Sequence, residues 1–82
     1  MEIYIIYTET EMLLSKKSYN SWREIQDEYS DFKASLGPWS SPEVLEFLEL
    51  DYPKLDPPAA IQINQFIVSN SPTVLLSFKA AL

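Results

Sequence analysis

Carboxylates are the only side chains in this 82-residue chain that are grouped densely enough to suggest chemistry. Between Glu24 and Asp56 lie nine of the twelve acidic residues, against two lysines, so this stretch carries a formal charge of −7. Grouped carboxylates can act in pairs as general acid and base across a cleft, or they can steer and dock a basic partner. Because so short a chain has little room for a deep cleft of its own, the second use is favoured.

The residue types that most enzymes need are missing. The chain has no histidine and no cysteine, so it cannot build a serine–histidine or cysteine–histidine pair, or the common kind of zinc site. Its one glycine, Gly37, is followed by proline, and a single glycine cannot form a phosphate-binding loop. We therefore expect a protein that is not an enzyme and that uses no cofactor and no metal.

The overall charge of −6 also disfavours direct binding of nucleic acid, because phosphate contacts need clustered basic residues and the six in this chain are scattered. Residues 57–78 are uncharged, but prolines and side-chain amides interrupt them, so they do not predict a membrane span. The first residues do not resemble a secretory signal. We expect a cytoplasmic protein that folds as a single compact domain over residues 1–82.

The N-terminal residues predict the clearest β-strand. Residues 3–7 are β-branched and aromatic, as strand residues tend to be. A turn at residues 8–10 would lead into a second short strand, residues 12–15, and complete a hairpin. The turn lacks the Asn-Gly or Asp-Gly pair that favours a tight hairpin, so a lone strand is the alternative.

Two acidic amphipathic helices are predicted next. The first would begin at Ser21, in a sequence typical of a capping box, and end before Gly37. Residues at steps of three and four would form its apolar stripe: Trp22, Ile25, Tyr29, Phe32 and Leu36. A separate side of the helix would carry carboxylates: Glu24, Asp27, Glu28 and Asp31.

The second helix is predicted to begin with a serine cap at Ser40 and to stop before Pro53. Its apolar residues are too dense for a single stripe, and a strand over residues 44–50 is the alternative. Acidic residues recur at steps of three: Glu43, Glu46 and Glu49. Trp39 would lie in the loop between the two helices, where it either closes the helix pair or stands exposed as an interface anchor.

An apolar pair of elements is predicted to complete a small α+β domain. Residues 59–69 favour a helix, with a strand paired to residues 3–7 as the alternative, and residues 72–81 favour a C-terminal helix. This last third carries a single charge, Lys79. It would form the main core, or it would leave apolar surface exposed for a partner or a homodimer.

These observations favour a protein that binds another protein. The leading hypothesis is a small acidic inhibitor, of immunity or anti-effector type, that blocks a basic, nucleic-acid-handling partner by charge complementarity. Carboxylates on two helices could then imitate the phosphate spacing of a duplex. The predicted partner-binding residues are Glu24, Asp27, Glu28, Asp31, Trp39, Glu43 and Glu46.

Two other interpretations stay open. The acidic residues could serve only to keep a small protein soluble. The alternative function is a non-catalytic structural subunit or assembly factor that docks through the apolar C-terminal third, with a homo-oligomer as one form of it.

Overall fold

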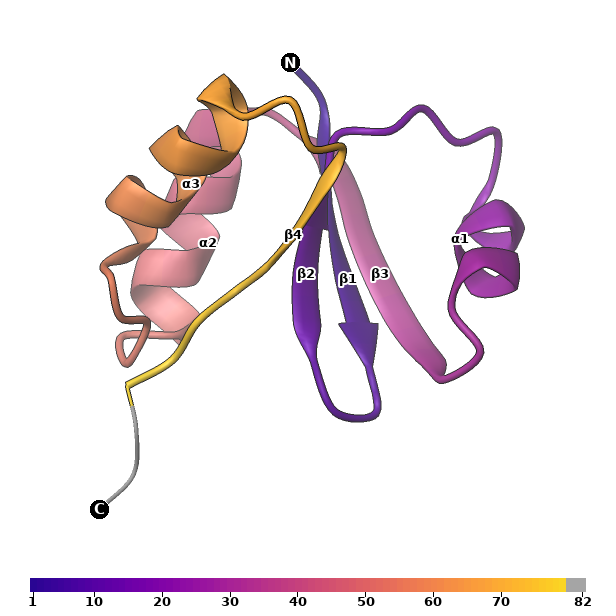
Figure 1. The fold of residues 1–82 in the computed structure, drawn as a ribbon, viewed down its shortest axis with the longest axis horizontal. Helices are drawn as coiled ribbons and strands as arrows, with labels where there is room; N and C mark the ends of the chain where they lie inside the picture. Colours follow the sequence, from indigo (N-terminus) through magenta and orange to yellow (C-terminus); the bar gives the residue numbers. More distant parts are fainter. Residues whose placement is uncertain (80–82) are drawn as a thin grey trace.

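An antiparallel sheet with helices on both faces forms a small α+β domain (Figure 1). The computed structural model describes residues 1–79, within which four strands pair in the order β3-β1-β2-β4. In chain order the elements are β1 (Ile3–Thr8), β2 (Met12–Ser15), α1 (Trp22–Glu28), β3 (Phe32–Trp39), α2 (Ser41–Asp51), α3 (Ala59–Val68) and β4 (Thr73–Leu75). Strands and helices are therefore interleaved. None of the helices in residues 1–79 is long and apolar enough to cross a membrane.

The central strand β1 contributes side chains to two separate cores. Ile3 and Ile5 lie in one core and Ile6 lies in the other, and all three are completely buried. The first core is covered by α2 and α3, and the second is covered by α1, which contributes Ile25. Figure 1 shows these helices on the two sides of the sheet. The alternation follows from strand geometry, in which successive side chains point to opposite faces.

The hairpin is confirmed, but the first predicted helix is wrong beyond residue 28. Residues 32–39 form β3, an edge strand that pairs with β1. Phe32 and Leu36 fit a helical spacing, yet they pack into different cores because the register of β3 shifts between Phe32 and Ala34. Pairing with β1 thus overrides the local periodicity. Trp22, which was expected in the core, is 54% exposed.

The sequence predicts that Gly37 ends a helix, but Gly37 lies inside β3. Its φ of +109° is positive, and a Cβ atom there would lie 2.7 Å from the carbonyl oxygen of Ile3. The close approach of β1 and β3 therefore requires glycine at this position.

The second half of the chain agrees with the sequence prediction more closely. Ser40 caps α2 in a capping box with Glu43, and residues 59–68 are helical and not a strand. The predicted helix over 72–81 is wrong where it can be compared, since residues 73–75 form β4 along the edge of β2. Residues 80–81, the end of that predicted helix, lie outside the described residues.

A buried glutamine holds the segment after β4 against α3. The Nε2 of Gln62 donates to the carbonyl oxygens of Pro57 at 2.7 Å and Ser77 at 2.8 Å, and its Oε1 accepts from the Ser77 amide at 2.9 Å. The side-chain amide thereby pairs with the backbone of Ser77 as a neighbouring strand would. Such groups lose access to water when the chain folds, so they need these partners.

Replacing Gln62 with alanine should lower the free energy of unfolding by about 2–3 kcal/mol, because backbone groups at Pro57 and Ser77 would lose their buried partner. Gln65→Ala, an exposed glutamine on the same helix, is the matched control and should change it by less than about 0.5 kcal/mol. Urea unfolding followed by circular dichroism measures both. Equal effects would contradict a structural role for the Gln62 amide.

Candidate protein-binding site

The predicted partner-binding carboxylates do not form one surface. Glu24, Asp27 and Glu28 of α1 lie on the face of the sheet where Ile25 is buried, and Glu43 and Glu46 of α2 lie on the face where Val44 and Leu48 are buried. The prediction that Asp31 belongs to the first helix is wrong, because α1 ends at Glu28 and Asp31 lies in the turn before β3. The two acidic helices are separated by the full thickness of the sheet (Figure 1). The structure brings together only Trp39, Glu43 and Glu46 from the predicted set.

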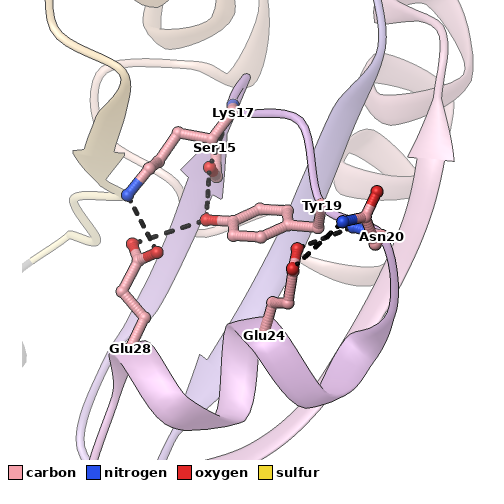
Figure 2. Close-up of polar contacts among 6 residues, drawn as sticks. All are labelled: Ser15, Lys17, Tyr19, Asn20, Glu24 and Glu28. Carbon is pink, nitrogen blue, oxygen red and sulfur yellow. Dashed lines mark hydrogen bonds and ion pairs between the residues drawn. The ribbon is translucent and has the colours of Figure 1, made fainter.

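The acidic residues of α1 are largely engaged by the segment that precedes the helix (Figure 2). Glu24 accepts hydrogen bonds from the backbone and side-chain nitrogens of Asn20, at 2.7 and 3.2 Å. Glu28 forms an ion pair with Lys17 at 2.8 Å and accepts a longer hydrogen bond from the Tyr19 hydroxyl. These two carboxylates therefore attach residues 17–20 to α1, which gives them a structural use.

Helix α2 has a second face, part apolar and part acidic, in addition to the one that it buries. Val44 and Leu48 are fully buried in the core. Four other residues follow the helical spacing i, i+3, i+4 and i+7 on a different side: Glu43, Glu46, Phe47 and Leu50. Leu50 is 74% exposed, so this side of the helix presents apolar surface to solvent.

Trp39 packs against this second face and forms a shallow pocket with it. The prediction that Trp39 lies in a loop between two helices is wrong, since Trp39 is the last residue of β3. Its ring meets the Phe47 ring edge to face, with centroids 5.4 Å apart. The two rings, together with Leu50, Glu43 and Glu46, line an open depression of about 300 Å³. We call this depression the Trp39 pocket. Trp39 and Phe47 are partly buried, so each ring is held by the core and still reaches the surface.

The pocket continues into a strip of aromatic rings, here called the aromatic strip: Trp39, Phe47, Tyr52 and Phe78. Phe47 and Tyr52 have centroids 5.8 Å apart, and Tyr52 and Phe78 have centroids 6.2 Å apart. Tyr52 and Phe78 line a second depression of about 360 Å³, in which Glu11 is the acidic residue. The strip thus connects two depressions that both contain carboxylates.

The carboxylates that line the two depressions form no ion pair with the described residues. No lysine or arginine of the described chain lines either depression. The ion pair found within residues 1–79 joins Lys17 and Glu28 on the other face of the sheet, and Lys16 donates to the last carbonyl groups of α3. Glu43 accepts hydrogen bonds from the backbone nitrogen and hydroxyl of Ser40, which lower its pKa. Glu46 makes no side-chain hydrogen bond to the described residues, so its carboxylate is free to bind a cation.

A pair of tyrosine hydroxyls holds the middle of the strip to the sheet. The hydroxyls of Tyr7, on β1, and Tyr52, at the end of α2, lie 3.0 Å apart. Burial and then this hydrogen bond raise the pKa of Tyr7 above the ordinary value for tyrosine. Tyr7 is therefore neutral at physiological pH, and the negative charge of the site comes from carboxylates.

Sequence reasoning missed Phe47, Leu50 and Phe78 as site residues. The signal for two of them was present, since the apolar residues of α2 are too many for one buried stripe, and the surplus forms the exposed face. Phe78 gave no such signal, because its place beside Tyr52 depends on the path of the chain after β4.

Comparison of the chain with protein-family models, with curated proteins and with solved structures found no match. Within residues 1–79 no group of three or more acidic side chains is arranged to hold a metal ion. The candidate site therefore has to be interpreted from its own geometry.

The Tyr7 hydroxyl predicts how stability depends on pH. Because its pKa is higher in the folded than in the unfolded chain, the folded state keeps a proton that the unfolded state loses above about pH 10. Its stabilisation is complete below that pH and declines as pH rises further. Tyr7→Phe should show a shallower loss of unfolding free energy between about pH 9 and 11, by less than about 1.4 kcal/mol per pH unit, since the group is partly exposed.

Urea unfolding at a series of pH values measures this difference. Burial also raises the pKa of Tyr19 and Tyr29, but both residues are retained in the variant, so they affect the two proteins alike. Parallel curves for the two proteins would show that Tyr7 does not titrate differently on folding.

Proposed function

We propose that this chain is a protein-binding domain that docks on a basic protein through the Trp39 pocket and the aromatic strip. It acts by occupancy: its bound surface keeps other ligands off the partner. A basic surface that otherwise holds nucleic acid is the kind of target whose occupation would inhibit it. In this proposal the chain is a small acidic inhibitor and has no catalytic role.

The observation that carries the proposal is the combination of half-exposed aromatic rings with unpaired carboxylates at one place. Trp39 and Phe47 form the pocket wall, Leu50 is exposed beside them, and Glu46 has no cation within the described residues. Interfaces draw much of their binding energy from such aromatic anchors once water is excluded around them. The carboxylates add complementarity to a basic partner and speed its approach.

The placement of the two acidic helices limits which of the predicted carboxylates a single partner could contact. A surface that imitates duplex phosphates would need carboxylates in a continuous series, with roughly one charge per ~1.7 Å of axis. The carboxylates of α1 and α2 lie on opposite faces of the sheet, so one partner surface cannot contact both sets as a single series. We therefore assign recognition to the α2 side, and we assign Glu24 and Glu28 to the structure of α1.

An assembly role has one observation in its favour. A shallow apolar groove of about 210 Å³ runs between α2 and α3, lined by Pro42, Leu45, Ala60 and Ile67 among others. Of these residues, Ala60 on α3 is exposed. A subunit that docks permanently would use this groove, and its binding would depend little on salt.

One pair of variants tests the proposal with equal changes of charge on the two faces. Glu46→Lys, at the Trp39 pocket, should weaken capture of the partner from a lysate of the native host by at least about tenfold. Asp27→Lys, on α1, makes the same change at an exposed helical position and should leave capture within about twofold. Quantitative mass spectrometry of the eluate, in a salt gradient, measures both.

Two further variants complete the design. Trp39→Ala should also weaken capture, whereas Ala60→Lys, at an exposed residue that lines the groove between α2 and α3, should have no effect. Circular dichroism confirms that each variant is folded. If Ala60→Lys abolishes capture while Glu46→Lys does not, the assembly role replaces the binding role proposed here.

A further inference from the structure

We infer that the Trp39 pocket receives an arginine side chain of the partner. The guanidinium would pack on the Trp39 and Phe47 rings on one side and pair with the Glu46 carboxylate on the other. This inference rests on the proposed function and names the chemical group that the pocket recognises. Its basis is the fit of the pocket in shape, surface and charge to a planar cation.

The aromatic walls supply the first part of the fit. Because the rings of Trp39 and Phe47 meet edge to face at 67°, they form two walls of different orientation and leave ring surface toward the depression. A cation over an aromatic face is attracted by the ring quadrupole, and tryptophan is the strongest of the aromatic residues in this respect. The volume of about 300 Å³ is at the lower limit for small-molecule sites, so it suits a single side chain.

The carboxylates supply the second part. Glu43 and Glu46 are one helical turn apart and both line the pocket. Glu43 is held in place by its two hydrogen bonds from Ser40, so it contributes a stationary negative charge. Glu46, which has no such bond to residues 1–79, can turn to accept a cation. No basic side chain from the described chain competes for this position.

Arginine fits this arrangement better than the other candidates. The guanidinium is planar, stacks on aromatic rings and donates two parallel hydrogen bonds to one carboxylate, whereas the ammonium of lysine is a compact, strongly hydrated point charge. An apolar side chain would fill the depression beside the rings, but it would leave Glu46 unpaired at a newly desolvated interface, which is unfavourable. The pocket therefore selects for a group that is both flat and positive.

Fluorescence of Trp39 measures this binding directly. The chain has two tryptophans, so a Trp22→Phe background leaves Trp39 as the only reporter, and Trp22 lies outside the pocket. The probe is the peptide acetyl-Gly-Arg-Gly-amide, compared with the same peptide containing citrulline, which has nearly the same shape without the charge, or lysine. We expect saturable binding of the arginine peptide with a Kd on the order of 1 mM, and binding at least about tenfold weaker for citrulline and about threefold weaker for lysine.

Variants in the same background show where the peptide binds. Glu46→Gln should raise the Kd of the arginine peptide by about tenfold. Asp27→Asn, the matched change on α1, should leave that Kd unchanged. Equal binding of the arginine and citrulline peptides, or no saturable change up to about 20 mM of arginine peptide, would overturn the inference.

The two proposals fail in distinguishable ways. If the arginine peptide does not bind but Glu46→Lys still abolishes partner capture, the arginine inference is wrong and the proposed function stands. If the peptide binds but capture is insensitive to Glu46→Lys, the pocket accepts arginine and the proposed docking face is wrong.

Discussion

Burial of β1 on both faces is the constraint on which the rest of this structure depends. The two cores share this strand: α2 and α3 close the first core, and the short helix α1 closes the second. Because Ile3 and Ile5 face one way and Ile6 faces the other, the chain must cross the sheet edge between α1 and α2. The edge strand β3 follows α1 and precedes α2, so the two acidic helices lie on opposite faces of the sheet.

The candidate site follows from this crossing. β3 ends at Trp39, one residue before the Ser40 cap of α2, so the tryptophan ring is delivered directly onto the flank of the new helix. α2 has to bury Val44 and Leu48 to close its core, and its remaining apolar residues, Phe47 and Leu50, turn outward beside that ring. The residues at the junction of β3 and α2 thus build a surface that combines aromatic rings with free carboxylates.

The α+β class and the cap of α2 could be predicted because local patterns decide them. Local patterns also favour the hairpin and the helix at 59–68, but they leave a lone strand and a strand paired to residues 3–7 as alternatives. β3 could not, because Phe32 and Leu36 fit a helix in sequence and only pairing with β1 makes them strand residues. For the same reason the sequence predicts a helix where β4 pairs with β2. The sequence shows the acidic and aromatic residue types of the site. It does not show that the acidic residues divide between two faces, because this depends on the sheet order, which no local pattern encodes.

The central claim is that recognition lies on the α2 side of the sheet, and oxidative footprinting of side chains tests it most directly. Trp39 and Trp22 are surface tryptophans on opposite faces, so each protein sample contains its own internal control. In the complex with the captured partner, Trp39, Phe47 and Leu50 should lose reactivity toward hydroxyl radicals, while Trp22 keeps its reactivity. Protection of Trp22 with Trp39 unchanged would place the partner on the α1 face and contradict the account.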